Sequence, residues 1–276
     1  MSLQLNDKDS VLYKEFYGMN VDQMPVLIAD NRVPLSVNGL MTRRLEVVKS
    51  DNTELADTWL NNYFDTGDAI VYHPDGRIKV VNDAQALREI TPESNRVNGA
   101  LVLTDEAYNS LDGAEFTRND LKKHVGRSLR KGEVLDNPLW HVLSREDKAL
   151  LTEYAGMIFS KAKTQHGYDE NMGLYLANAQ EAPTMRLWSV SRLYYRGDAD
   201  GDVSLDGYSG RLVGVAPEAQ SVVAKKLEGK LEPIVEVRTQ LLAAPTLDQI
   251  MAVSERFIAP AVRDDYKAAI SDLYKQ

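Results

Sequence analysis

The sequence predicts an α+β fold, with a strand-rich N-terminal part that contains a β-hairpin and a mostly helical C-terminal part. Two β-type runs flank turn residues 74–76 in the first part, and amphipathic segments with helix caps dominate after residue 117. We place the change near residue 104, which gives parts 1–104 and 105–276; one continuous domain is the alternative. A chain of 276 residues can bury a sufficient core in either arrangement.

The N-terminal part is expected to begin with strands. The segment "MPVLIADNRVPLSV" contains two short apolar runs separated by the turn pair Asp30-Asn31, and "RLEVV" is a further strand candidate. The segment "NTELADTWLNNYF" carries apolar residues at helical spacing and predicts a short helix. "AIVYHPDGRIKVV" predicts the hairpin, because Pro presets φ and Gly accepts a positive φ in the turn.

Helix caps organise the middle of the chain. "GALVLTDEAYNSL" is interpreted as a strand that leads into a helix capped by Thr104. Thr117 and Asp120 form a capping box at the start of "RNDLKKHVGRSLRK". Asn137-Pro138 then opens a short apolar turn, because Pro is well suited to the first helical position.

The second half is predicted to contain further helices. Ser144 is expected to cap "REDKALLTEYAGMIFSKAKTQ", which ends at Gly167. "APTMRLWSVSRLYY" is predicted to be another helix, with Pro183 near its start. "GRLVGVAPEA" is a strand candidate, and the proline-punctuated segments beyond Pro217 predict helices that continue through "DDYKAAISDLYKQ".

Composition limits the class of protein and its compartment. The absence of cysteine excludes disulfides, thiolate zinc sites, iron–sulfur clusters and cysteine nucleophiles, and it suits a reducing compartment. The first residues lack the apolar stretch of a signal peptide, and no apolar run reaches the ~18 residues of a membrane helix, so we expect a soluble cytoplasmic protein. The formal charge of −9 disfavours nucleic acid and anionic membranes as partners.

A run of aspartates between glycines, "YRGDADGDVSLDGYSG", is the candidate metal site. The carboxylates that would bind calcium or magnesium are those of Asp198, Asp200, Asp202 and Asp206. Their spacing matches part of an EF-hand loop, but Val203 stands where that loop needs Gly, and Ser209 where it needs a bidentate Glu. A different cation loop is one interpretation. A solvated acidic turn is the other, since Asp-Gly pairs are common in turns.

Other catalytic motifs are weak in this sequence. The triplet at residues 65–67, Asp-Thr-Gly, occurs in aspartic proteases, but here it is found once and follows a predicted helix, so we interpret it as a turn. His166 lies near Asp169 and Glu170, and a helix C-terminal histidine explains it without a metal. Phosphate-loop, dinucleotide-binding and nucleophile-elbow motifs are absent.

Two segments could carry binding. "MRLWSVSRLYYRG" mixes three arginines with Trp188, Tyr194 and Tyr195, and these residue types are enriched at protein interfaces. "LKKHVGRSLRKGE" surrounds an apolar stripe with basic residues, including Lys122 and Lys123, and could meet phosphate or an acidic protein surface. A solvated helix face is the simpler interpretation of the second segment.

The sequence therefore favours a non-enzymatic interaction or structural module, with an Arg/aromatic surface over residues 186–210 and an acidic loop that could bind a cation. Its partner would be another protein or a second copy of the chain. The alternative is a divalent-metal-dependent hydrolase that uses the aspartates of residues 198–206 to activate water. A deep pocket that joins these aspartates to His166 or His141 would favour the hydrolase, and a broad Arg/aromatic patch would favour the module.

Overall fold

The computed structural model describes residues 11–217, which all belong to one compact unit, Met1–Gln220. The helices predicted after Pro217 lie outside the described residues. Within residues 11–217 the strands are β1 (Tyr13–Tyr17), β2 (Val33–Pro34), β3 (Phe64–Tyr72), β4 (Arg77–Val81), β5 (Arg96–Val97), β6 (Ala100–Val102), β7 (Ala114–Thr117), β8 (Leu174–Tyr175), β9 (Thr184–Val190), β10 (Ala199–Asp200) and β11 (Arg211–Val215). The helices of this part are α2 (Asn20–Ala29), α3 (Val37–Lys49), α4 (Thr53–Leu60), α5 (Gln85–Arg88), α6 (Asp105–Ser110), α7 (Arg118–Leu121), α8 (Lys131–Leu135), α9 (Pro138–Leu143), α10 (Lys148–His166) and the 3₁₀ helix η1 (Leu193–Tyr195).

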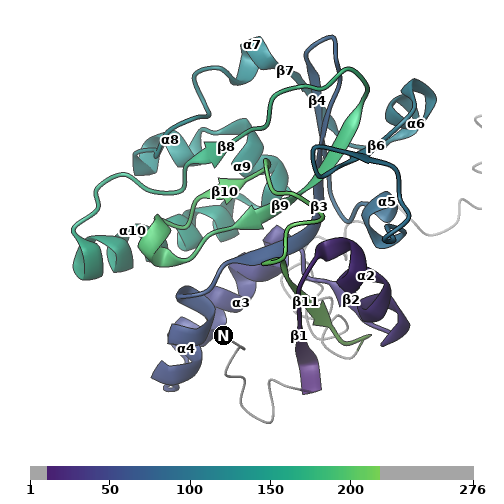
Figure 1. Ribbon diagram of the computed structural model, residues 1–276. Helices are drawn as coiled ribbons and strands as arrows, with labels where there is room; N and C mark the ends of the chain where they lie inside the picture. Colours follow the sequence, from purple (N-terminus) through teal and green to yellow (C-terminus); the bar gives the residue numbers. More distant parts are fainter. Residues whose placement is uncertain (1–10, 218–276) are drawn as a thin grey trace, which may run out of the picture. The chain divides into compact units, whose positions relative to one another are not determined.

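These strands form one mixed sheet with the central order β1-β11-β3-β9-β10-β8 (Figure 1). The antiparallel pair β3–β9 is the centre of the sheet, and its register shifts at a bulge between Asp65 and Ala69. β4 and β7 extend the sheet beyond β3, while β6 and β5 extend it beyond β9. Strands from both sides of residue 104 thus share one sheet, because β6 pairs with β9 and β7 pairs with β4.

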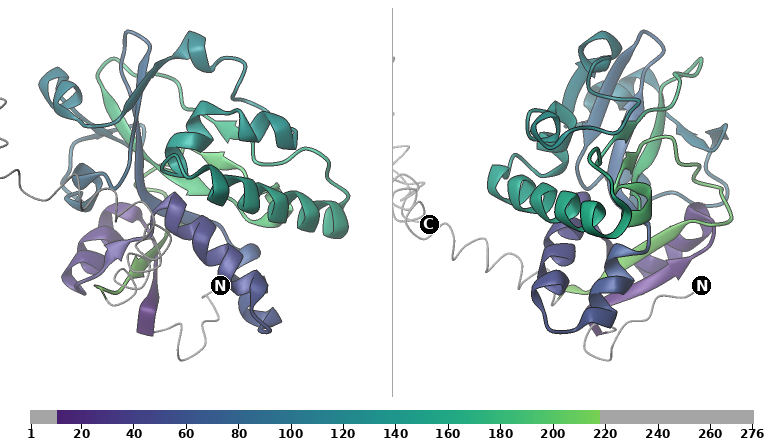
Figure 2. Two further views of the ribbon diagram at one scale, coloured as in Figure 1. Left: turned by 180° about the vertical axis from the view of Figure 1, so that it is seen from behind. Right: turned by 90° about the vertical axis from the view of Figure 1, so that its left-hand side faces the viewer.

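Helices cover both faces of the sheet (Figures 1 and 2). One hydrophobic core contains side chains of α3, α4, α8, α9 and α10, and the other contains side chains of α2, α5 and α6. β9 supplies both cores in alternation: Met185 and Leu187 pack with α2, whereas Trp188 and Val190 pack with α3 and α10. Each large side chain buried in this way contributes about 1.5–3 kcal/mol to stability.

The predicted distribution of helices and strands is wrong. "MPVLIADNRVPLSV" belongs mainly to α2 and the two-residue strand β2, and "RLEVV" belongs to α3, whose cap Ser36 accepts a hydrogen bond from Gly39 N at 3.0 Å. "TMRLWSV", predicted to be a helix, is the central strand β9. The second part is therefore not mostly helical, since β8 to β11 complete the sheet there. A strand buried on both faces lacks alternating polarity, so its sequence resembles that of a buried helix.

The local turn and cap signals were more reliable. The hairpin is confirmed, with Tyr72 paired to Ile78 across the turn. Thr104 caps α6, the Thr117/Asp120 box caps the short helix α7, and Asn137 caps α9. The predicted Ser144 cap is wrong: Arg145 and Glu146 have positive φ, and α10 begins only after Asp147, which accepts from Leu150 N at 2.9 Å. In residues 11–217 no helix has the length and apolarity needed to cross a membrane.

Candidate functional site

The register of the strands brings aromatic and arginine residues to one end of the sheet. Tyr17 of β1 pairs with Arg211 of β11, and Phe64 of β3 pairs with Val190 of β9. Residues that are paired across strands are neighbours in space, so the residues that follow or precede these pairs in the chain lie at the same end of the sheet. We call this region the sheet-end surface, and its exposed or partly exposed members are Tyr17, Tyr63, Tyr168, Arg192, Tyr194, Tyr195, Arg196 and Tyr208, with the buried Arg211 beneath them.

The first part of this surface is η1. The Arg192 guanidinium lies 4.7 Å from the ring centre of Tyr195 and 5.6 Å from that of Tyr194, and the two rings are 5.2 Å apart, edge to face. Both tyrosines are slightly more than half exposed, at 54% and 55%. Cation–π contacts near the surface add roughly 0.5–1 kcal/mol each, so they orient the half-buried Arg192.

The end of α10 adds a second stack to the surface. The Arg196 guanidinium lies 4.3 Å from the ring centre of Tyr168. The His166 ring is 5.5 Å from the rings of both Tyr168 and Tyr194, and so it joins this stack to η1. Gly167, with φ +74°, ends α10 as predicted and turns the chain into a depression of about 560 Å³ that Tyr168 and Arg196 help to line.

A third stack lies where β1 and β11 meet. The Arg211 guanidinium is 5.4 Å from the ring centre of Tyr17 and 4.8 Å from that of Tyr63, and its Nε is 2.9 Å from Glu15. The Tyr63 hydroxyl donates to the Ser209 carbonyl, and burial raises the pKa of this hydroxyl, so it remains a donor at neutral pH. This bond holds the loop that presents the 85% exposed Tyr208 nearby.

A buried arginine fixes the loop that carries η1. Arg44 of α3 is fully buried, and its guanidinium donates to the carbonyls of Trp59, Asn62 and Ser191 at 2.9–3.1 Å and to the Tyr154 hydroxyl at 2.9 Å. It therefore joins α3, α4 and α10 to the first residue of that loop. Sequence reasoning missed Arg44, although its position four residues after Leu40 places it on the buried side of an amphipathic helix.

The Asp-Thr-Gly triplet has a structural role at the bulge of β3. It lies inside a strand rather than in the predicted turn between a helix and a strand. The Asp65 carboxylate accepts from Arg211 N at 2.8 Å, and the Asp68 carboxylate accepts from Val37 N at 2.7 Å and Asp83 N at 2.9 Å. Burial raises the pKa of Asp68 to about 6. These two aspartates anchor the starts of β11 and α3 instead of forming a catalytic pair.

The four aspartates of the predicted metal loop have separate protein partners. The Asp198 carboxylate accepts from Gly173 N at 2.6 Å, and the Asp200 carboxylate accepts from Asp202 N at 2.8 Å. Burial raises the pKa of Asp198 to about 6, and burial also raises the pKa of Asp200. Asp202 points to solvent, with one carboxylate oxygen 3.9 Å from Arg186 Nε.

The last of the four, Asp206, lies on the other side of the loop. Its carboxylate accepts from the Ser204 hydroxyl at 2.5 Å and is 3.6 Å from Arg96 Nε. In the part of the chain that the structure describes, no group of three or more His, Asp or Glu side chains is arranged to hold a metal ion. Calcium or magnesium binding by the loop stays a prediction, which a melting experiment below tests.

Arg186 and Trp188 begin the predicted Arg/aromatic surface but are buried in β9, and Arg186, together with Tyr72, instead holds this loop against the sheet. The buried Arg186 of β9 donates to the carbonyls of Asp202 and Val203 at 3.2 and 3.0 Å. The Tyr72 hydroxyl donates to the Gly201 carbonyl at 2.9 Å and accepts from Ala177 N at 3.1 Å. The segment between β10 and β11 is thus held by hydrogen bonds from Arg186 and Tyr72 to its main-chain carbonyls, and these bonds do not involve the aspartate side chains.

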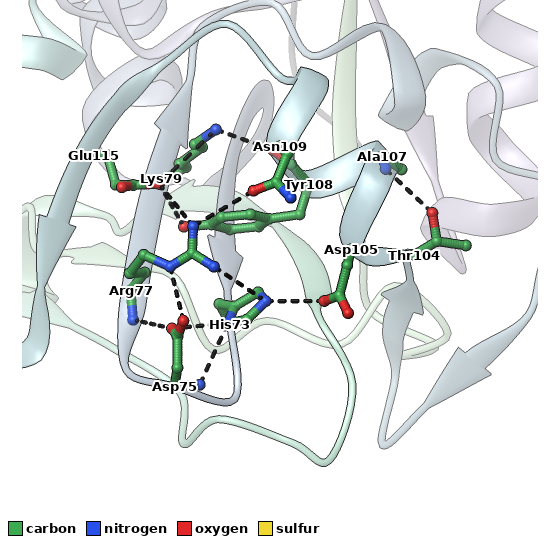
Figure 3. Close-up of polar contacts among 10 residues, drawn as sticks. All are labelled: His73, Asp75, Arg77, Lys79, Thr104, Asp105, Ala107, Tyr108, Asn109 and Glu115. Carbon is green, nitrogen blue, oxygen red and sulfur yellow. Dashed lines mark hydrogen bonds and ion pairs between the residues drawn. The ribbon is translucent and has the colours of Figure 1, made fainter.

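A separate polar cluster joins the hairpin to α6 (Figure 3). The two ring nitrogens of His73 lie 2.7 Å from Asp75 and 2.9 Å from Asp105. The Arg77 backbone N–H and guanidinium lower the pKa of Asp75 to about 2, and the guanidinium also lies 4.9 Å from the ring centre of Tyr108. Each charged group of the cluster faces another member, so we interpret it as a clamp between α6 and the hairpin.

Comparison with known proteins identifies the fold. No family model and no curated protein matches the chain. The chain is similar to a solved structure described as "Accommodation of massive sequence variation in Nanoarchaeota by the C-type lectin fold", with a TM-score of 0.54 and 19% identity, over 74% of this chain and 97% of that chain. The described unit has the C-type lectin fold. On this C-type lectin fold, the sheet-end surface combines three Arg/Tyr stacks with buried anchors.

Proposed function

We propose that this C-type lectin-fold unit is an interaction module that binds a protein partner, or a second copy of the chain, through the sheet-end surface. The observation that carries the proposal is the exposure of Tyr194, Tyr195 and Tyr208, each more than half accessible and gathered with arginines at one end of the sheet. Tyr and Arg are enriched, together with Trp, among the energetically dominant residues of protein interfaces. Exposed aromatic groups that gather in one place indicate an interaction site.

The similar structure from Nanoarchaeota supports this proposal. Its description states that the C-type lectin fold accommodates massive sequence variation. A scaffold of this kind needs surface side chains that can be substituted without disrupting the hydrophobic core. Here Arg192, Tyr194, Tyr195 and Tyr208 lie outside both hydrophobic cores, whereas the anchor Arg44 is fully buried. We infer that the surface can be replaced while the fold persists.

The divalent-metal-dependent hydrolase is the less favoured alternative. It needs aspartates that converge on one ion, whereas Asp198 and Asp200 accept hydrogen bonds from different main-chain groups. His166, the candidate base, contacts tyrosines of the sheet-end surface. We keep the cytoplasm as the proposed location, because a chain without cysteine suits a reducing compartment.

Site-specific photo-crosslinking tests the proposal. A benzophenone amino acid is placed at Tyr194, Tyr195 or Tyr208, and at the control positions Val26 and Val97, which are 52% and 36% exposed. We expect a discrete adduct from the three surface positions and none from the controls. The partner, identified by mass spectrometry and purified, should bind the unlabelled chain with a measurable Kd. Equal adducts from all five positions, or none from any, would remove the proposal.

A further inference from the structure

The basic segment forms a turn with a depression beside it, between α7 and α9. The depression has a volume of about 860 Å³, within the range of small-molecule sites. Its lining residues are Phe116, Asn119, Asp120, Lys122, Lys123, His124 and Pro138. The predicted basic helix is interrupted between Leu121, which ends α7, and Lys131, which begins α8. The consecutive side chains of Lys122, Lys123 and His124 therefore lie in a turn.

The lysine charges of this turn have no partner in the part of the chain that the structure describes. Lys122 and Lys123 are exposed, and neither forms an ion pair among residues 11–217. The neighbouring Arg127, by contrast, is ion-paired with Glu133, at 2.6 Å. The carboxylate of Asp120 accepts hydrogen bonds from the Thr117 backbone N–H at 2.9 Å and from the Thr117 hydroxyl at 2.7 Å. These bonds hold the Asp120 side chain at the start of α7.

The His124 ring is partly buried next to two cationic side chains. Burial is the first cause that lowers its pKa, and the charges of Lys123 and Arg127 lower it further. The ring is therefore mostly neutral at pH 7, and a bound dianion would favour its protonated form. The turn itself is held in place, because the Asn137 side chain donates to the His124 carbonyl at 2.9 Å.

Two of the residues that line the depression are apolar. Phe116 of β7 is only partly buried and packs on the larger core, and Pro138, the first residue of α9, lines the same depression. An exposed ring face can stack on a flat ligand, while two adjacent ammonium groups bind a phosphate as point charges. We propose that this depression binds a phosphorylated small molecule with a flat ring, the phosphate on Lys122 and Lys123 and the ring on Phe116.

NMR titration of the His124 ring in the full chain tests this site. The probes are inorganic phosphate, AMP and ribose 5-phosphate. With each probe, we expect a saturable change and an upward shift of the pH at which the ring titrates, since the dianion stabilises the imidazolium. The Kd should rise at least tenfold in Lys122→Gln/Lys123→Gln and should stay unchanged in Lys148→Gln, a control on α10 that is also exposed and forms no ion pair in residues 11–217.

Several results would overturn the site. The first is the absence of a saturable change with any probe, and the second is an equal loss of affinity in Lys148→Gln. The third is salt-sensitive binding of an oligothymidylate without saturable binding of phosphate, which would indicate a nucleic-acid site instead. AMP should bind more tightly than ribose 5-phosphate, and Phe116→Ala should weaken AMP but not phosphate. Equal affinity for AMP and ribose 5-phosphate would refute the ring contact even if Phe116→Ala fails to fold.

Discussion

Replacing Arg44 by Met should destabilise the unit and loosen the loop that presents η1. Met keeps the apolar volume of the side chain and removes its four hydrogen bonds, which leaves three carbonyls and the Tyr154 hydroxyl without this donor. One of these carbonyls belongs to Ser191, which begins the loop. The substitution therefore tests whether the surface is positioned from the core.

The expected cost follows from the burial of Arg44. Hydrogen bonds from a charged donor contribute about 1.5–3 kcal/mol each, so four amount to roughly 6–12 kcal/mol. Keeping a guanidinium out of water, with no carboxylate paired to it among residues 11–217, costs several kcal/mol in return. The net loss should be about 3–5 kcal/mol, or roughly 10 °C in melting temperature for a unit of this size.

Urea unfolding and hydrogen exchange measure these effects. Arg44→Met should lower the free energy of unfolding by the stated amount and speed amide exchange over residues 191–197. Arg44→Lys, which keeps the charge with fewer donors, should lie between the variant and the wild type. A loss below about 1 kcal/mol, with unchanged exchange in the loop, would refute the reasoning, because surface substitutions cost that little.

Three further predictions concern the strand bulge and the aspartate loop. Gly201→Ala should cost about 1–3 kcal/mol in urea unfolding, because a Cβ there would lie 2.8 Å from a buried tyrosine hydroxyl and 2.9 Å from an isoleucine methyl, whereas Gly132→Ala meets nothing within 4 Å and should cost nothing. The pKa of Asp68 is raised to about 6 in the folded protein, so its protonated form stabilises the fold. This stabilisation, about 3 kcal/mol, is fully present below about pH 4 and is lost as the pH rises through 6. The free energy of unfolding of Asp68→Asn should lack this pH dependence. Parallel profiles of the two proteins between pH 4 and 7 would contradict this. If the acidic loop binds calcium or magnesium, the cation at ~100 times its Kd should stabilise the chain by roughly 2.7 kcal/mol in a thermal melt, and Asp198→Asn/Asp200→Asn should abolish the shift; no shift in the wild type would exclude the metal.

Local chemistry made parts of the fold predictable. Thr104, Asn137 and the turn at residues 74–76 act through bonds to neighbours two to three residues away, so the sequence alone contains their cause. The formation of strand β9 depends instead on the helices that cover the two faces of the sheet. "TMRLWSV" became a strand because helices cover both sheet faces, and that information lies in distant segments, from α10, which ends 18 residues earlier, to α2, more than 150 residues earlier.

The candidate site was predictable in composition and not in arrangement. The mixture of Arg192, Tyr194 and Tyr195 is visible in the sequence as an interface-like segment. Its extension to Tyr17 and Arg211 follows from the pairing of β1 with β11, which short-range patterns do not reveal. The aspartates illustrate the opposite case, since their spacing suggested a common ligand while main-chain donors hold two of them apart.

A variant with serine at Arg192, Tyr194, Tyr195 and Tyr208 tests the central claim most directly. A benzophenone at Tyr17, which is 48% exposed and belongs to the same surface, reports partner contact in both the wild type and the variant. We predict loss of the partner adduct and a melting temperature within about 8 °C of the wild type, since the two lost cation–π contacts of Arg192 are worth roughly 1–2 kcal/mol together. An undiminished adduct, or a variant that does not fold, would contradict a binding surface that is independent of the core.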